Sequence, residues 1–297
     1  MPGDPFNYSS SVSGEDLDSG YTEEQLKELR AYYGLDQPIG AQFVQSVKRL
    51  LHGDLGQSIY YKRPVIDVLA VRLPWSLYIM LSSLIVSLFL GVAMALICRS
   101  HKKMDKIFYS IFSAQAEIPS FLIAILFLFL IAARYRAIPL SGNLTPFATY
   151  ASLGDKIYDI FIHSLLPILS MVLVTLPQFY FTARASFLSV EEKLYVTYAH
   201  AKGLRPVHIN THYILRNSIS PLVMRFFLSI GTAVSGTILI ENVFSYPGLG
   251  RVLREAVMYR DYPMIQGVFL LSTCMVLVSV FIADAINYIH GRRCASK

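Results

Sequence analysis

Charged residues are scarce in this chain, and so are cysteine and tryptophan. Only 15% of its 297 residues are Asp, Glu, Lys or Arg, whereas 54% are hydrophobic. A soluble domain is usually about one quarter charged. The composition therefore disfavours a soluble globular protein and indicates a membrane protein. The net charge of +6 is then better explained by basic loops between apolar spans than by a surface for nucleic acid.

The motifs of common enzyme classes are also missing. The sequence contains no Gly-x-x-x-x-Gly-Lys-Ser/Thr phosphate loop, no His-Glu-x-x-His zinc motif and no Gly-x-Ser-x-Gly nucleophile motif. Cys98, Cys274 and Cys294 have no spacing typical of a metal site or a disulfide framework. His208 and His212 lie four residues apart, but no third metal ligand is close in sequence. We expect no catalytic residue, no metal site and no cofactor bound by this chain.

Five long apolar stretches are present instead. A helix needs about 20 apolar residues to cross a bilayer, because lipid cannot satisfy backbone polar groups. The stretches are too long for spanning strands and lack their period-two alternation. We predict an all-α, polytopic membrane protein with five transmembrane helices in a domain covering 76–290. The predicted spans are roughly 76–98, 111–133, 161–183, 219–240 and 264–287.

The basic residues predict an orientation. Loop 99–110, loop 184–218 and the tail 291–297 together carry twelve Lys or Arg, whereas loops 134–160 and 241–263 carry six. Cytoplasmic loops are the richer in Lys and Arg. We therefore expect the first three regions in the cytoplasm, including the C-terminus.

The N-terminal region 1–75 would then lie outside the membrane on the opposite side. It is polar, and the first residues lack the basic and apolar regions of a signal peptide. We therefore expect a preceding helix that this sequence lacks. Thr22–Gln25 reads as a capping box for a helix ending at Gly34, residues 41–52 read as a second amphipathic helix, and Gly53–Gly56 reads as a turn.

A polar, basic segment at 194–221 separates the third and fourth apolar stretches. Its first part predicts a helix that ends at Gly203 and carries small side chains at Ala199 and Ala201. Small residues let another backbone approach closely, so this helix is suited to docking on a cytoplasmic protein. An ordinary solvated loop is an equally good interpretation from these physical features alone.

Resemblance to a known family favours the docking interpretation. The segment Tyr195–Leu204, Tyr-Val-Thr-Tyr-Ala-His-Ala-Lys-Gly-Leu, followed by Ile214–Pro221, resembles the coupling loop of ABC importer permeases. More narrowly, it resembles the first permease subunit of dipeptide, oligopeptide and nickel importers. Segments in the family's order support this, above all Glu241–Gly250 and Arg260–Gly267. Other matching segments are Pro2–Pro5, Tyr33–Pro38, Gly53–Ser58, Arg63–Val65, Arg72–Pro74 and Ile118–Phe121.

The resemblance implies a type I ABC permease fold in a bacterial or archaeal inner or plasma membrane. It also implies partners: a second homologous permease, two cytoplasmic ATPases that bind ATP and Mg²⁺, and an extracytoplasmic binding protein. The ATPase-coupling residues would be Thr197, Tyr198, Ala199, His200, Ala201, Lys202, Gly203 and Arg205. The solute would be a peptide, nickel or a metal chelate. The polar residues Glu117, Gln178, Glu241 and Asn242 are our candidates for the substrate path.

The sequence departs from the family at both ends. Members normally carry a transmembrane helix before the segment that corresponds to Pro2–Pro5, which gives six. Members commonly end the last helix with Asp-Pro-Arg, where this chain has Gly291–Arg293. The alternative function is an ATP-independent channel or secondary transporter, which should show ionisable relays and two related halves.

Overall fold

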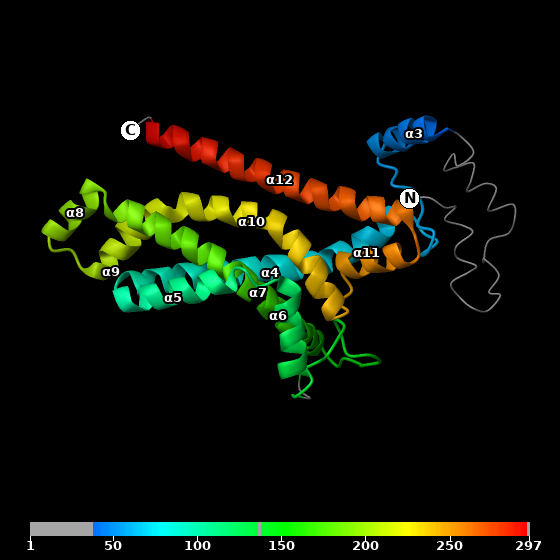
Figure 1. Ribbon diagram of the computed structural model, residues 1–297, viewed down its shortest axis with the longest axis horizontal. Helices are drawn as coiled ribbons and strands as arrows, with labels where there is room; N and C mark the ends of the chain where they lie inside the picture. Colours follow the sequence, from blue (N-terminus) through cyan, green and yellow to red (C-terminus); the bar gives the residue numbers. More distant parts are fainter. Residues whose placement is uncertain (1–37, 136–137, 296–297) are drawn as a thin grey trace, which may run out of the picture. The chain divides into compact units, whose positions relative to one another are not determined.

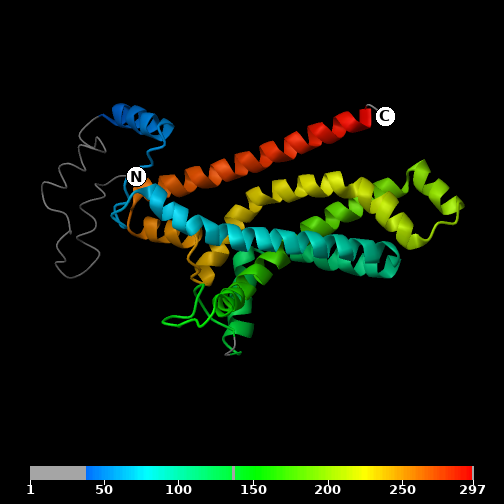
Figure 2. The same ribbon diagram turned by 180° about the vertical axis from the view of Figure 1, so that it is seen from behind.

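The computed structural model describes residues 38–135 and 138–295, and Figures 1 and 2 show it from opposite sides. Apart from one isolated bridge between Gln57 and Pro64, the regular structure in these ranges is helical. The helices are α3 (Ile39–Leu51), α4 (Val65–Arg99), α5 (Lys102–Gln115), α6 (Ser120–Phe127), η1 (Leu128–Ala132), α7 (Leu153–Glu191), α8 (Leu194–Ala201), α9 (Pro206–His208), η2 (Ile209–Leu215), α10 (Arg216–Val243), α11 (Leu249–Met258) and α12 (Tyr262–Ala295).

The chain divides into two compact units. Of the described residues, unit 1 comprises 38–73 and 252–271, and unit 2 comprises 74–135, 138–251 and 272–295. The predicted capping box at Thr22–Gln25 and the helix ending at Gly34 lie outside the described residues. The predicted second amphipathic helix is present as α3, and the predicted turn follows it with positive φ at Gly53 and Gly56.

Four of the five predicted spans lie within single long helices. Helices α4, α7, the run Pro206–Val243 and α12 are each long and apolar enough to cross a membrane. Each extends beyond its predicted span. Helix α4, for example, begins directly after Pro64 and continues through Pro74. The all-α prediction is therefore confirmed in the described residues.

The predicted span 111–133 is not one continuous helix, and this corrects the sequence-based interpretation. Helix α5 ends at Gln115, and α6 begins at Ser120 after a bend of 97°. Pro119 stands at the N-cap of α6 with extended ψ, so the chain cannot continue helically into it. The pair is either one broken span or a re-entrant loop.

Helices α4 and α7 pack closely against each other in unit 2. Ser87 Oγ lies 2.6 Å from Thr175 Oγ1, and Tyr78 Oη lies 3.2 Å from Ser164 Oγ. A Cβ on Gly91 would lie only 2.9 Å from the Cβ of Phe179, so the glycine is needed for this approach. Buried hydroxyls and one glycine therefore hold these two helices together along their length.

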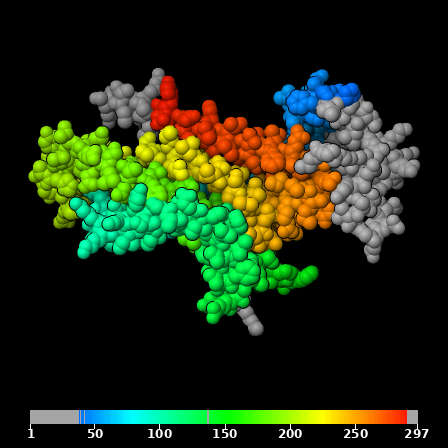
Figure 3. Space-filling model, in the orientation of Figure 1, coloured from blue at the N-terminus to red at the C-terminus, as the bar shows by residue number. Residues whose placement is uncertain are grey.

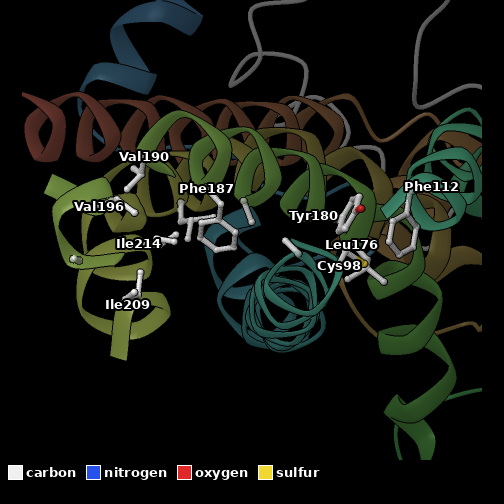
Figure 4. Packing of buried hydrophobic residues seen from close by; sticks show 13 residues of the cluster. Cys98, Phe112, Leu176, Tyr180, Phe187, Val190, Val196, Ile209 and Ile214 are labelled. Carbon is white, nitrogen blue, oxygen red and sulfur yellow. The ribbon is translucent and has the colours of Figure 1, made fainter. Parts of the chain in front are cut away.

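Two groups of buried apolar side chains support unit 2. The first core joins α4, α5 and α7 to α8, η2 and α10; its labelled members in Figure 4 are Cys98, Phe112, Leu176, Tyr180, Phe187, Val190, Val196, Ile209 and Ile214. The second core lies among α4, α6, α7 and α10, and includes Leu84, Ala124 and Ile240. The first core thus reaches from the long helices into the predicted coupling segment.

Unit 1 is held together by polar contacts between the turn after α3 and the start of α12. Asp261 is fully buried; it accepts hydrogen bonds from Ser58 Oγ and from the backbone N–H of Tyr60 and Met264. Tyr61 donates a hydrogen bond to Glu255. Burial, and then this carboxylate, raise the pKa of Tyr61 well above its usual range, so its hydroxyl remains a donor at neutral pH.

Candidate functional site

The predicted coupling segment folds as a short helix between two long ones. Helix α7 ends at Glu191, α8 follows after two residues, and the chain returns through α9 and η2 into α10. Figure 1 shows α8 and α9 beyond the ends of α7 and α10, and Figure 3 shows the same segment on the molecular surface. The helix predicted to end at Gly203 is therefore present as α8.

One face of α8 packs against the chain itself. Val196 and Ala199 are almost fully buried, together with Ile209 and Ile214 of η2. The small side chain of Ala199 thus serves internal packing in this chain, although the sequence interpretation grouped it with residues that face a partner. The buried face fixes the direction in which the other face of α8 points.

The opposite face is exposed. It combines apolar side chains, Leu194 and Tyr198, with basic ones, and Val207 of the following helix α9 is exposed as well. The remaining predicted coupling residues are all exposed: Thr197, Tyr198, His200, Ala201, Lys202, Gly203 and Arg205. An exposed apolar patch beside basic residues is typical of a surface that binds another protein.

Gly203 ends this helix for a backbone reason. Its φ is +67°, in the left-handed region that glycine adopts without strain. Its N–H bonds to the carbonyl of His200 at 2.9 Å, and the N–H of Leu204 bonds to that of Ala199 at 3.3 Å. A Cβ at Gly203 would meet no atom of this chain within 4 Å. The glycine therefore sets the turn, and leaves open space beside it.

Arg99 connects the segment to α4, and sequence reasoning did not identify this role. Its Nε and Nη2 donate to the two carboxylate oxygens of Glu191 at 3.1 and 2.9 Å, and its Nη1 donates to Asn210. Glu191 directly precedes the segment and Asn210 follows α9. One guanidinium therefore holds both flanks of the segment to the end of α4.

A second ion pair joins α5 to α7 at the same end of unit 2. Arg184 donates from Nε and Nη2 to the two oxygens of Asp105, each at 2.7 Å, and Tyr180 donates to the same carboxylate at 3.0 Å. Both ion pairs are bidentate, so they fix orientation as well as distance. The coupling segment is thus attached to an end of unit 2 at which ion pairs fix α4, α5 and α7 to one another.

The predicted path residues fall in different surroundings. Glu117 is exposed and lies in the break between α5 and α6. Beside it, Gln115 donates to the carbonyl of Leu173 in α7. Pro119 is the N-cap of α6, so Glu117 lies just before the proline at which the helix is interrupted.

Gln178 has a partner that the sequence did not reveal. Its Oε1 accepts a hydrogen bond of 2.7 Å from Nη2 of Arg225, which lies in α10. In the sequence, Arg225 is recognisable only as an ionisable residue inside the predicted span 219–240. Pairing it with Gln178 requires knowing that α7 and α10 run side by side, which no motif in either helix indicates.

Glu241 and Asn242 lie in the last turn of α10. The side chain of Glu241 is fully buried, and its Oε2 accepts from the backbone N–H of Gly250 at 2.6 Å. Any Cβ on Gly248 or Gly250 would collide with this carboxylate. Asn242 donates to the carbonyl of Ile238 at 3.0 Å. Glu241 therefore holds the turn that begins α11, and no part of it faces open space.

No group of three or more His, Cys, Asp or Glu side chains is placed to hold a metal ion among the residues that the structure describes. His208 and His212 stack on each other at a centroid distance of 4.3 Å on the exposed surface of α9 and η2.

Comparison with known proteins identifies the family. The model for "Binding-protein-dependent transport system inner membrane component" matches residues 87–296. A protein of Brucella suis biovar 1 named as a peptide permease is 31% identical over 283 residues, which are 94% of this chain and 86% of the relative. The glutathione transport system permease protein GsiC of Pectobacterium atrosepticum is 29% identical, covering 95% of this chain and 86% of that protein.

The dipeptide transport system permease protein DppB of Escherichia coli K12 is 28% identical over 301 residues, covering 95% of this chain and 87% of that protein. The relatives are permease subunits, which work with ATPases and a solute-binding protein rather than catalysing a reaction themselves. This chain belongs to the binding-protein-dependent transport system inner membrane components, as a non-catalytic permease subunit of an ABC importer.

Proposed function

We propose that this chain forms half of the path by which an ATP-driven importer takes peptides across the inner membrane. A second, homologous permease would form the other half. The names of its relatives, which include peptide, glutathione and dipeptide permeases, support a peptide over nickel or a metal chelate. The family disfavours the ATP-independent carrier that the sequence left open.

The proposed orientation places α8 and the C-terminus in the cytoplasm. Its support is the excess of Lys and Arg in 99–110, 184–218 and 291–297. Two ATPase subunits or domains would then dock on the exposed face of α8, and the binding protein would deliver solute from the other side. ATP and Mg²⁺ would bind to the ATPases, and this chain would bind neither.

The mounting of α8 is the observation that carries the proposal. A coupling helix must be exposed to the ATPase that moves it and rigidly joined to the transmembrane helices that follow its motion. Helix α8 exposes Tyr198 and Lys202, whereas Val196 and Ala199 anchor it in the first core. Arg99 ties both flanks to α4, which is itself closely packed on α7. Motion of the ATPases would therefore turn α4, α7 and α10 as one body and alternate the access to the path.

Two tyrosines with nearly equal exposure provide a matched test. Tyr198 of α8 is 66% exposed, and Tyr158 near the other end of unit 2 is 67% exposed. Replacing Tyr198 by Asp introduces a charge at the proposed interface without disturbing the core, so we expect the ATPase subunits to be lost on purification and uptake to fall by at least about tenfold. Tyr158→Asp should retain the ATPases. Equal retention of ATPase subunits in both variants would overturn the docking proposal.

A further inference from the structure

The uncovered face of α10 carries polar as well as apolar side chains, unlike an ordinary lipid-facing surface. Beyond Pro221, the exposed residues of this helix are Leu228, Thr232, Ser235 and Leu239, which follow one another every three or four positions. Arg225, half-buried, continues the same face one turn before Leu228. A membrane helix that presents Arg, Thr and Ser on one face turns this face toward protein or water rather than lipid.

Arg225 is incompletely satisfied within this chain. It lies in α10, six residues after the start of the predicted span 219–240. Among the described residues, its hydrogen-bond partner is Gln178, whose Oε1 accepts from Nη2. Its Nε is buried without a hydrogen-bond partner, and it forms no ion pair with any carboxylate of the described residues. A guanidinium has five N–H donors and remains charged, so this position lacks an anionic acceptor.

Gln178 of α7 supplies the polar groups that lie next to Arg225. Its Oε1 is used by Arg225, and its backbone carbonyl accepts from Thr182 Oγ1 at 2.8 Å. Its side-chain amide N–H₂ meets no acceptor among the residues that the structure describes, and it adds neutral donors beside the guanidinium. An arginine and a glutamine amide side by side match the two oxygens of a carboxylate and carry one compensating charge.

We propose that Arg225 and Gln178 bind the C-terminal carboxylate of the peptide as it passes through the membrane. This inference rests on the proposed function, since every linear peptide with a free C-terminus carries that group, whatever its side chains. A site for it would therefore suit a transporter of many peptides. Thr232 and Ser235, farther along the same face of α10, provide neutral hydrogen-bonding groups for the rest of the backbone.

A carboxylate of the second permease is the other source of the same chemistry, and the test separates the two. The complex of both permeases, the ATPases and the binding protein is reconstituted in vesicles. The probe is whichever of dialanine, trialanine and pentaalanine the wild-type complex imports fastest. Uptake and ATP hydrolysis are measured at saturating binding protein, together with co-purification of the second permease.

Arg225→Gln should lower uptake by about tenfold or more while ATP hydrolysis stays within about twofold, because the charged contact to the solute is lost and the coupling segment is untouched. Arg225→Lys keeps the positive charge but lacks the paired N–H donors of the guanidinium. Its uptake should therefore lie between that of Arg225→Gln and that of the wild type. The matched control Arg254→Gln removes an exposed arginine outside the spans and should leave uptake unchanged.

Gln178→Glu distinguishes solute binding from a purely structural contact between α7 and α10. Glutamate would pair with Arg225 and strengthen such a contact, but it would also occupy the carboxylate site. We expect uptake to fall as in Arg225→Gln with the complex intact. Normal uptake in either variant would overturn the inference, and so would loss of the second permease from Arg225→Gln, which would assign the arginine to the subunit interface. Failure of the wild-type complex to import any of the three peptides would instead overturn the proposed function, and this inference with it.

Discussion

Helices α4 and α10 both cross the apolar part of unit 2, yet their uncovered faces differ in kind. Between Ser76 and Cys98, every exposed residue of α4 is apolar: Leu81, Ile85, Val86, Phe89, Leu90, Ala93 and Ile97. The buried Ser83 and Ser87 of α4 donate instead to carbonyl oxygens of α7. The uncovered face of α10 includes Thr232 and Ser235, and Arg225 lies in line with them. The exposed face of α4 is therefore suited to contact with lipid, whereas that of α10 is suited to lining the substrate path.

A charge introduced on each uncovered face should give the largest difference between the two helices. Leu90 of α4 and Leu228 of α10 are 45% and 40% exposed. Aspartate in the centre of a lipid-facing helix costs about 3 kcal/mol on insertion scales, so Leu90→Asp should greatly reduce the amount of assembled complex. Leu228→Asp should assemble normally but abolish uptake, because its carboxylate would lie three residues from Arg225 and pair with it. The two amounts of complex are compared after purification, and equal loss in both variants would contradict the assignment of the faces.

The covered faces of the same helices provide a second, smaller comparison. A Cβ on Gly91 would meet backbone as well as side-chain atoms of α7, with Tyr180 N at 2.9 Å, whereas one on Gly231 of α10 would meet a methyl of Val276 at 3.3 Å. Gly91→Ala should therefore destabilise the complex by about 1–3 kcal/mol. Gly231→Ala should have less effect, since a side-chain methyl can shift. The measurement is the midpoint of thermal unfolding in detergent. An equal shift for both variants would contradict the close approach of α4 to α7 at Gly91.

These contrasts also show which parts of the molecule the sequence could predict. Apolar length identified the positions of the spans, because the bilayer fixes how long such helices must be. It missed the break at 116–119, since apolar residues continue on both sides of it. Pro119 was a usable signal for the break, because the residue before a proline disfavours the helical conformation.

The candidate site divides in the same way. The end of α8 at Gly203 followed from residue type, since glycine is the usual residue for a left-handed helix end. The burial of Ala199 did not follow, because small residues suit both internal packing and docking. Glu241 was recognised as a polar residue at the end of a span, but its contact with Gly250 depends on how the turn after α10 folds back. The pairing of Arg225 with Gln178 depends on packing between helices far apart in sequence.

Accessibility to water tests the central distinction between the two faces most directly. In a background with Cys98, Cys274 and Cys294 replaced by Ala, single cysteines are introduced at Ser235 in α10 and at Leu90 in α4. A charged, membrane-impermeant thiol reagent requires water to reach and ionise its target. We predict that Ser235→Cys in the assembled complex reacts at least about tenfold faster than Leu90→Cys, and that imported peptide slows the reaction at position 235 alone. Equal rates at the two positions, or faster labelling at position 90, would contradict the account.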